Sequence, residues 1–468
     1  MSARTISAPS APASVSLDEA YKLASEHEQQ GRFDEAERLL AAILARHPDQ
    51  PDALHLSGIL AARRNRFADA AAQMQRALDR GMSPALVCRN LCEVYRRLGR
   101  LDDAVAVGRR AVALAPNDPH ALVNLAIIHY DRLELAEGMA CSERAIAIDP
   151  NLPGAHFELS EALLLSGDFS RGWDEYEWRF RIAGAGKLMP DTDKPQWDGR
   201  SMPDGTLLLI GDQGFGDVIQ FGRYIPWAAR RCPNTVLACS RDMRMVAGQF
   251  PGPTAMFDRW EQAPAFDAFC PLSGLPRLHG TRPDTVPIET IPYLRADAAR
   301  AAAWSGRLDR LLPPGYRRIG IAWAGRPTHN NDYNRSTTLA ACAPIADLPG
   351  IALVSLQKGP AAAQVGHYVG RAPLLNLGPE IADWSDTMAI LHALDLVVSV
   401  DTSVAHLAGA MGRTAWVMLP RAPDWRWLLN RTDTPWYPTL RLFRQPAPRR
   451  WDRVTEEVAA ALHRLIGG

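Results

Sequence analysis

The apolar positions of this chain follow one pattern in its first half and another in its second. Between about residues 17 and 183, large apolar residues and small residues return at a fixed distance along the chain. After Gly205, short apolar runs alternate with polar loops and helical patterns; the clearest runs are 206–210, 319–323, 351–356, 396–400 and 414–419. Such runs between helices of about ten residues are typical of buried parallel strands. The pattern therefore predicts a helical first half and an α/β second half.

The fixed distance in the first half is 34 residues. It separates the large apolar residues Phe33, Phe67, Leu101, Leu135 and Phe169, and the small residues Ala36, Ala70, Ala104, Gly138 and Gly172. Small residues let two helices approach closely, and large apolar residues fill the space between helix pairs. A period of this length with these residue types is typical of tetratricopeptide repeats. We therefore predict an all-α solenoid of about five repeats at residues 17–183.

A solenoid of this kind has a concave groove that usually holds a peptide or a protein segment. Asn90 and Asn124 share one phase on the first helix of their repeats. They resemble the asparagine ladder in the repeats of protein O-linked N-acetylglucosamine transferases, whose side-chain amides hold the backbone of an acceptor, and the resemblance implies that these two amides contact an acceptor chain in the groove. The alternative is that both are solvated polar side chains.

The last repeat is more aromatic than a free solenoid end, which normally presents a polar cap. Its segment 172–180 reads GWDEYEWRF. We expect this helix to dock on the next domain, and Trp197 in the following linker to join the same contact.

The first predicted strand, 206–210, runs into the glycine-rich turn GDQGFGD (211–217) and then into a helical pattern that extends to about residue 231. This unit brings the backbone close to a ligand at a helix N-terminus. Its glycine spacing differs from the dinucleotide fingerprint, and the Walker lysine is missing. We expect Gln213, Gly214 and Gly216 to line a cleft. Asp217 has two compatible interpretations, a helix N-cap and a general base at the mouth of that cleft.

Polar residues also follow the predicted strands of the C-terminal part. Asp401, Thr402 and Ser403 come after the strand 396–400 and open a helix that contains His406. Arg335 and Ser336 open a second predicted helix, which runs to about residue 348. Gln357 and Lys358 follow the strand 351–356.

These residues predict a phosphate site, because ligands bind at the carboxyl ends of parallel strands and helix N-termini attract anions. Arg335 and the segment 401–403 would hold a diphosphate from two sides, while Gln357 and Lys358 would lie near the base of the nucleotide. The alternatives are helix capping alone for Asp401, a core histidine for His406 and a surface arginine for Arg335.

Two of these segments resemble the heptosyltransferase-type (family 9) glycosyltransferases. They are GFGDVIQF (214–221), followed by Arg223 and Tyr224, and VDTSVAHLAG (400–409). The segments DWRW (424–427), PWYP (435–438) and RLFRQ (441–445) resemble the bacterial relatives that carry tetratricopeptide repeats. The resemblance covers about residues 20–465 and implies the GT-B architecture. In that architecture two Rossmann-like domains face each other across a cleft, the nucleotide-sugar donor binds the C-terminal one, and no metal is required.

The resemblance also implies roles for single residues. Asp217 matches the catalytic base of the family, and Asp401, Thr402 and His406 match its motif for the donor diphosphate. Ser403 stands where heptosyltransferases usually have glycine, which argues against ADP-heptose as the donor. Arg335 stands where they commonly have lysine; arginine keeps the charge and adds planar bidentate donors.

The sequence therefore predicts five parts: a disordered tail (1–16), the repeats (17–183), a linker (184–204), a GT-B N-terminal acceptor domain (205–313) and a GT-B C-terminal donor domain (314–468). We expect the final helix, at about 453–465, to pack across the cleft. The expected function is inverting transfer of a sugar from a nucleotide donor to a protein acceptor in the repeat groove; the family suggests flagellin or another surface protein. The alternatives are a glycan or lipid-linked acceptor, or a non-catalytic adaptor with an inactive GT-B domain.

Composition narrows these classes further. The chain has 52 Lys and Arg residues against 52 Asp and Glu residues, and this balance argues against a nucleic-acid binder. No apolar run reaches the ~20 residues that span a bilayer. The seven cysteines show no metal-ligand spacing. We therefore expect reduced thiols, a cytoplasmic protein, and neither a metal nor a cofactor. The Ala-, Ser- and Pro-rich N-terminus lacks the apolar region of a signal peptide.

Overall fold

The computed structural model describes residues 16–182 and 189–467. The predicted tail, apart from Ser16, and residues 184–188 of the predicted linker lie outside the described residues. The chain divides into two compact units, Met1–Glu158 and Leu159–Gly468, which are described separately below. Among the described helices, none is both long and apolar enough to cross a bilayer.

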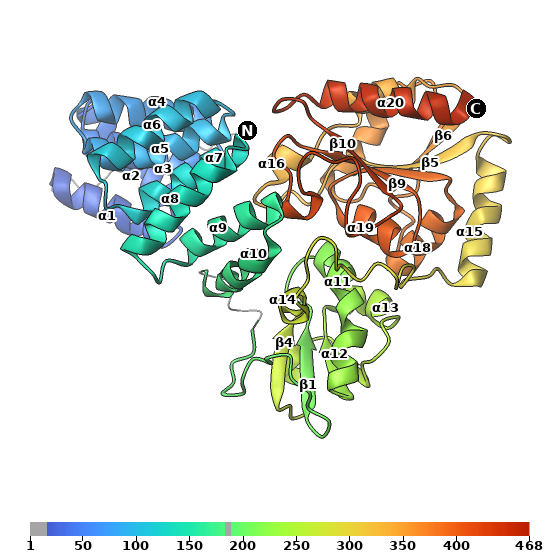
Figure 1. The fold of residues 1–468 in the computed structure, drawn as a ribbon. Helices are drawn as coiled ribbons and strands as arrows, with labels where there is room; N and C mark the ends of the chain where they lie inside the picture. The colour runs from blue at the N-terminus through green and yellow to red at the C-terminus, as the bar shows by residue number, and fades with distance from the viewer. Residues whose placement is uncertain (1–15, 183–188, 468) are drawn as a thin grey trace, which may run out of the picture. The chain divides into compact units, whose positions relative to one another are not determined.

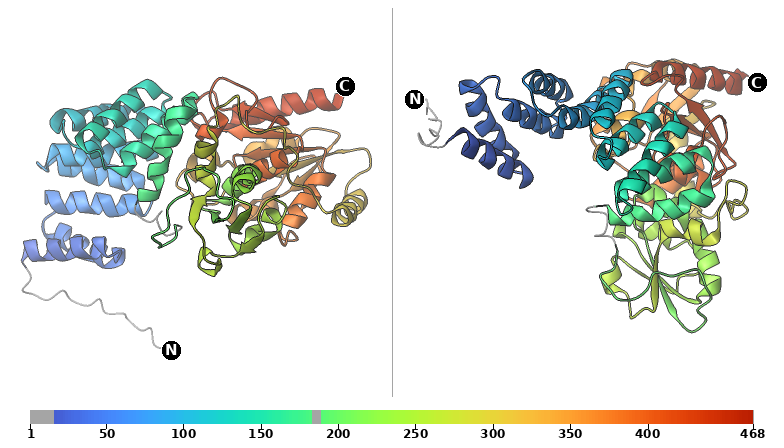
Figure 2. Two further views of the ribbon diagram at one scale, coloured as in Figure 1. Left: turned by 60° about the horizontal axis from the view of Figure 1, so that its bottom comes forward. Right: turned by 60° about the vertical axis from the view of Figure 1, so that its left-hand side comes forward.

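The N-terminal helices form the pairs that the 34-residue period predicts (Figures 1 and 2). In every pair, the large apolar residue that recurs every 34 residues, such as Phe33 or Phe67, is the first residue of the second helix. Proline begins the first helix of four pairs, where its missing N–H costs nothing. The pairs are α1 (Leu17–Gln29) with α2 (Phe33–Arg46), α3 (Pro51–Arg63) with α4 (Phe67–Asp79), α5 (Pro84–Arg97) with α6 (Leu101–Leu114), α7 (Pro119–Asp131) with α8 (Leu135–Ile148), and α9 (Pro153–Ser166) with α10 (Phe169–Tyr176).

The small residues of the period lie where two helices meet. Ala36, Ala70 and Ala104 are completely buried. A Cβ atom added to Gly172 of α10 would lie 2.7 Å from Cγ of Leu164 in α9. The boundary between the two units falls inside α9, so α10 belongs to the second unit.

The second unit contains two parallel sheets. The first has four strands in the order β3-β2-β1-β4, and the second has six in the order β10-β9-β8-β5-β6-β7. All strand pairs of both sheets are parallel. The strands are β1 (Thr206–Ile210), β2 (Asn234–Ala238), β3 (Ala255–Phe257), β4 (Ala268–Pro271), β5 (Arg317–Ala322), β6 (Ile351–Ser355), β7 (Leu374–Asn376), β8 (Leu396–Val400), β9 (Ala415–Leu419) and β10 (Leu440–Arg444). The α/β second half is therefore confirmed.

Helices connect and cover these strands. The longer ones are α15 (Ala298–Leu311), which packs against α18 (Trp384–Ala393), and α20 (Trp451–Gly467). The expectation that the final helix crosses the cleft is wrong, because α20 lies along the six-stranded sheet (Figure 1). Its apolar residues Val454, Val458 and Leu462 belong to the buried core on that face of the sheet.

Two predicted helices are interrupted. The segment after the glycine-rich turn consists of α11 (Phe215–Phe221), a 3-10 turn and α12 (Ile225–Arg231), with Pro226 in the first turn of α12. Residues 335–348 do not form one helix, since Arg335 ends the short α16 (Asp332–Arg335), and a 3-10 turn (Ala340–Cys342) precedes α17 (Ala343–Ala346). Pro344 lies in the first turn of α17, where a proline cannot continue a preceding helix.

The aromatic helix α10 docks within the second unit, as expected. Trp173 meets Trp425 edge-on with ring centroids 5.2 Å apart, and Phe169 stacks on Trp436 at 6.1 Å. The expectation for Trp197 is wrong, because its ring packs against Trp227 instead, at 5.5 Å.

The close contact at Gly172 gives a stability test. Gly172→Ala should lower the free energy of unfolding by about 1–3 kcal/mol, because the new methyl group overlaps buried Leu164. Gly306→Ala is the matched control in the interior of α15, where the nearest atom is the mobile end of Arg310 at 3.9 Å. That change should instead stabilise by about 0.5–1 kcal/mol. Urea unfolding of both variants checks the pair, and equal shifts would contradict the account of helix packing.

Candidate functional site

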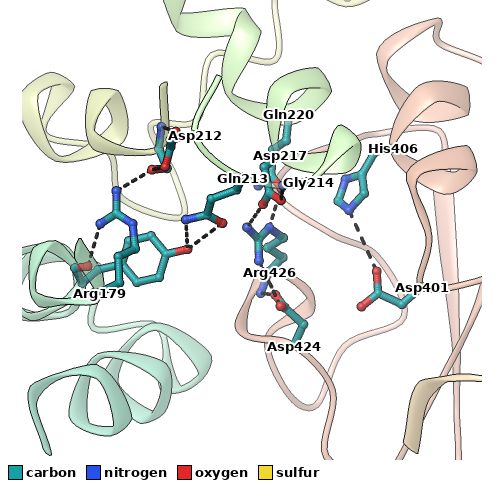
Figure 3. Close-up of polar contacts among 12 residues, drawn as sticks. Arg179, Asp212, Gln213, Gly214, Asp217, Gln220, Asp401, His406, Asp424 and Arg426 are labelled. Atoms are coloured by element: carbon teal, nitrogen blue, oxygen red, sulfur yellow. Dashed lines mark hydrogen bonds and ion pairs between the residues drawn. The ribbon is translucent and has the colours of Figure 1, made fainter. Parts of the chain in front are cut away.

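Asp217 lies at the third position of α11, close to the end of β1 (Figure 3). The N-cap residue of this helix is Gly214, so the N-cap interpretation of Asp217 is wrong by three residues. The Asp217 carboxylate instead accepts a hydrogen bond from the Gly214 N–H through Oδ2, at 2.9 Å. A carboxylate at this position still satisfies a free amide and complements the positive end of the helix.

Arg426 binds the other oxygen of Asp217 and comes from the C-terminal α/β part (Figure 3). Its guanidinium also donates to Gln220 Oε1 at 2.7 Å and to both oxygens of Asp424 at 2.9 Å. Arg426 is only 7% exposed. Burial disfavours its charge, yet Asp424 and then Asp217 raise the pKa of Arg426 above its usual value. The ion pairs therefore join the start of α11 to the segment 424–427.

Asp401 follows β8 and lies near this cluster. Its side chain is buried, and burial, followed by the charge of Asp424, raises the pKa of Asp401 above its usual value. Arg335 acts in the opposite direction. Three carboxylates and two arginines thus share one electrostatic environment at the ends of the strands.

His406, in α19 (Ser403–Ala410), lies in the core. Its Nδ1 is 3.1 Å from the Tyr437 hydroxyl, its ring stacks on Trp427, and its Nε2 is 3.9 Å from Asp401 Oδ1. Burial and the charge of Arg426 lower the pKa of His406 to about 3, so the imidazole is neutral at physiological pH. His406 therefore occupies the position expected of a core histidine, which was the alternative to a role in binding phosphate.

α11 and α19 approach each other closely at His406. A Cβ atom added to Gly216 would lie 2.9 Å from Cδ2 of His406. Glycine at this position therefore lets the turn that carries Asp217 pack directly on the helix that follows β8.

Arg335 and Ser336 lie on the loop after β5, and Arg335 ends α16 rather than opening a helix. The Arg335 Nε is 3.4 Å from Asp332 Oδ1. Among the described residues, its two terminal nitrogens have no hydrogen-bond partner, so they are open to an anion. The Ser336 hydroxyl donates to Asp332 Oδ1 and accepts from the Gly325 N–H, both at 2.8 Å. Ser336 therefore holds the loop together.

Thr402 is the N-cap of α19, but its hydroxyl does not cap the helix. It lies 3.0 Å from the Ser399 hydroxyl instead. The first amides of α19, which begin at Ser403, have no partner within the helix, as at any helix N-terminus. They point a partial positive charge toward the same strand ends as Arg335 and Asp401.

Gln357 and Lys358, expected near the base of the nucleotide, hold strand ends together, and the polar groups of the Gln357 side chain are used on the backbone. The buried Gln357 amide accepts from the N–H groups of Trp323 and Ala324, both at 2.9 Å, and donates to Ala324 O at 2.9 Å. Lys358 Nζ donates to the carbonyl oxygens of Gly378 and Ile381, at 3.4 and 2.5 Å. The sequence placed both residues correctly at a strand end but did not show that their polar groups bind backbone there.

The two asparagines of the repeats lie half-buried in the first unit. Asn90 Nδ2 is 3.0 Å from His55 Nε2, and Asn124 Nδ2 donates to the carbonyl of Arg89 at 2.9 Å. Both amides thus connect neighbouring first helices of the array. Their nitrogen atoms are engaged there, which favours a structural role over direct contact with an acceptor.

Sequence reasoning did not assign a role to Asp424 or Arg426. Arg426 and Asp217 are 209 residues apart, and ion pairs over such distances leave no periodic signal in a sequence. In the sequence, the segment DWRW (424–427) shows only a resemblance to bacterial glycosyltransferases that carry tetratricopeptide repeats. No group of three or more His, Cys, Asp or Glu residues suited to a metal occurs in the part of the chain that the structure describes.

Comparison with known proteins supports the repeats directly. Residues 21–85 and 89–153 match the model of the tetratricopeptide repeat family. Protein FlbA of Caulobacter vibrioides is 25% identical to this chain over 336 residues, which cover 65% of this chain and 54% of FlbA. The chain thus spans little more than half of that relative. Since the alignment covers more of this chain than Met1–Glu158, it extends into the second unit.

Solved structures show weaker similarity. YrrB, a tetratricopeptide protein with an unusual peptide-binding site, is 16% identical, with a TM-score of 0.30 over 36% of this chain and 87% of YrrB. PilF of Pseudomonas aeruginosa is 19% identical, with a TM-score of 0.33 over 37% of this chain and 79% of PilF.

The neutral, buried His406 predicts a pH dependence of stability. The unfolded chain binds a proton at this histidine below about pH 6.5, and the folded chain does so only near pH 3, so stability falls as the pH falls through this window. Between pH 7 and pH 5 the loss from this group is about 2 kcal/mol. His406→Phe should remove that part of the loss in urea unfolding.

Tyr437→Phe is the matched control, because it removes the same hydrogen bond and leaves the imidazole in place. It should retain the wild-type difference in stability between pH 7 and pH 5. The account of His406 is wrong if both variants show the same difference.

Proposed function

We propose that this chain is a glycosyltransferase of GT-B architecture that transfers a sugar from a nucleotide-activated donor to a protein acceptor. The observation that carries the proposal is the approach of α11, which carries Asp217, to α19 at His406 and to the loop after β5, where Arg326 lies over the Phe215 ring at 5.5 Å. A carboxylate thus lies beside a group of anion-binding donors, which is the arrangement that displacement of a phosphate leaving group requires.

In the proposed reaction Asp217 takes the proton from an acceptor hydroxyl. The oxygen attacks the anomeric carbon as the bond to the nucleoside diphosphate breaks, so one displacement inverts the anomeric centre. Asp217 Oδ2 accepts one hydrogen bond, from the Gly214 N–H, and retains a second lone pair for the incoming proton, while Oδ1 binds Arg426.

The leaving diphosphate gains negative charge, and two groups would stabilise it. The terminal nitrogens of Arg335 supply a cation, and the first amides of α19 supply dipoles aimed at the strand ends. His406 is neutral, so it supplies no positive charge to the leaving diphosphate.

The acceptor would be a protein, because tetratricopeptide arrays commonly bind peptides. The similarity to FlbA includes part of the second unit, so FlbA resembles this chain in more than its repeats. A glycan or lipid-linked acceptor, with the repeats serving in assembly, stays as an alternative.

A non-catalytic adaptor is a second candidate, and specific contacts favour it. Asp217 is already paired with Arg426, and Gln357 and Ser336 make internal hydrogen bonds. Buried ion pairs of this kind also occur where charges serve only structure.

Nucleotide binding distinguishes the two candidates. We expect one of a panel of nucleoside diphosphates to bind in calorimetry, and Arg335→Ala to weaken binding at least ten-fold, since charged hydrogen bonds contribute about 1.5–3 kcal/mol. Arg310→Ala, on the solvent side of α15, is the control and should bind as wild type. No heat with any nucleotide would favour the adaptor.

Asp217→Asn tests the catalytic role. This variant should bind the nucleotide within about two-fold of wild type and release nucleoside diphosphate from the nucleotide sugar about 10²–10⁴ times more slowly, because the general base is lost. Product release with unchanged rate would remove Asp217 from the mechanism.

A further inference from the structure

A buried polar network lies beneath the turn that carries Asp217. Arg179, in the 3-10 helix Glu177–Arg181 after α10, is 5% exposed, Asp212 is 3% exposed and Ser273 is 1% exposed. Arg179 donates to the Ser273 hydroxyl, which in turn donates to Asp212. The Ser273 N–H donates to the other Asp212 oxygen at 3.1 Å.

Arg179 is the cation of this network, and it also pairs with Glu177 at 3.1 Å. Burial raises the pKa of Asp212, and Arg179 followed by Ser273 opposes that shift. Removing Arg179 would leave a carboxylate without its counter-charge in the core, which costs several kcal/mol. Asp212 is the second residue of the turn 211–217, so the network fixes the beginning of that turn.

A second connection reaches the turn from α10. The Tyr176 hydroxyl lies 3.1 Å from the Gln213 side-chain amide. With the amide oriented so that its oxygen accepts from Tyr176 and from Arg179 Nε at 3.1 Å, its nitrogen donates to Asp217 Oδ1 at 3.3 Å. Figure 3 shows these side chains in a row from Arg179 through Gln213 to Asp217 and Arg426.

We infer that Tyr176 and Arg179 are positioning residues for Asp217, acting through Gln213 and Asp212. The inference rests on the proposed function, in which Asp217 is the base. The last helix of the repeat array and the short helix after it then belong to the catalytic half: they hold the turn 211–217, and their hydrogen bonds fix the direction of the Asp217 carboxylate.

The chemistry of the contacts supports this role over simple packing. Aromatic contacts with Trp425 already bury α10, and apolar side chains of similar volume could have filled the space of the network at no loss of stability. Directed hydrogen bonds differ from apolar contacts in fixing orientation, and misplacement of a catalytic group by about 1 Å can cost 10²-fold in rate.

The test compares Tyr176→Phe with Tyr368→Phe in the full chain. Tyr176→Phe removes the hydroxyl at Gln213 and keeps the ring among its aromatic neighbours. Tyr368→Phe removes a tyrosine hydroxyl that donates to Ala372 O at 2.8 Å in the donor part, away from the turn. The first readout, which needs no activity, is amide hydrogen exchange of residues 211–217.

We expect exchange in this turn to be about ten-fold faster in Tyr176→Phe and unchanged in Tyr368→Phe. In steady-state release of nucleoside diphosphate, Tyr176→Phe should lower kcat by about ten-fold and leave KM for the donor unchanged. Gln213→Leu should reproduce both effects, and the double variant should be no worse than Gln213→Leu alone, because the two residues share one connection.

The outcomes distinguish failure of the positioning role from failure of the proposed function. Wild-type exchange in Tyr176→Phe overturns the positioning role whatever the function is. Faster exchange with unchanged kcat, in an enzyme that Asp217→Asn inactivates, also overturns it and leaves the proposed function intact. If no nucleotide binds, the proposed function fails, and the exchange data alone decide whether α10 holds the turn.

Discussion

The second unit depends on the ion pairs of Arg426. This guanidinium is almost completely buried, and its donors reach Asp217 and Gln220 on one side and Asp424 on the other. Taking a charge out of water costs several kcal/mol, so the cluster is tolerable only because each guanidinium nitrogen has a partner. Its geometric effect is to hold the turn after β1 against the segment after β9. Any ligand at this place meets carboxylates whose directions are already fixed.

The same constraint explains the close packing around it. Burial disfavours a charge on His406, and with Arg426, Arg223 and Arg335 nearby a protonated imidazole would add a fourth cation, so the structure keeps His406 neutral. A neutral ring can then lie against Gly216, where no Cβ intervenes. The close approach of α11 to α19 therefore depends on the same charges that keep His406 neutral.

The sequence predicted the elements whose signal is local or periodic. β1 and β8 end where their apolar runs end, and the five helix pairs follow from a repeated spacing. It did not predict that Pro344 and the residues before it break the segment 335–348, nor that Gln357 uses its amide on backbone groups of the neighbouring strand. A polar residue at a strand end looks the same in sequence whether it binds a ligand or the backbone. The pairing of Asp217 with Arg426 is a tertiary contact without any local pattern.

The arginines around the site show how this ambiguity is resolved once contacts are known. Arg179, Arg223 and Arg426 are buried, and their donors bind carboxylates, hydroxyls or carbonyls of the chain itself. Such arginines hold segments of the chain together and have few donors left for a ligand. Arg335 differs, because within the described residues its terminal nitrogens have no partner, although Asp332 orients the side chain at Nε. An oriented cation with unused donors suits an exchangeable anion, since binding then requires little rearrangement. The proposed phosphate site at this strand end rests on this distinction between saturated and unsaturated arginines more than on the number of charges.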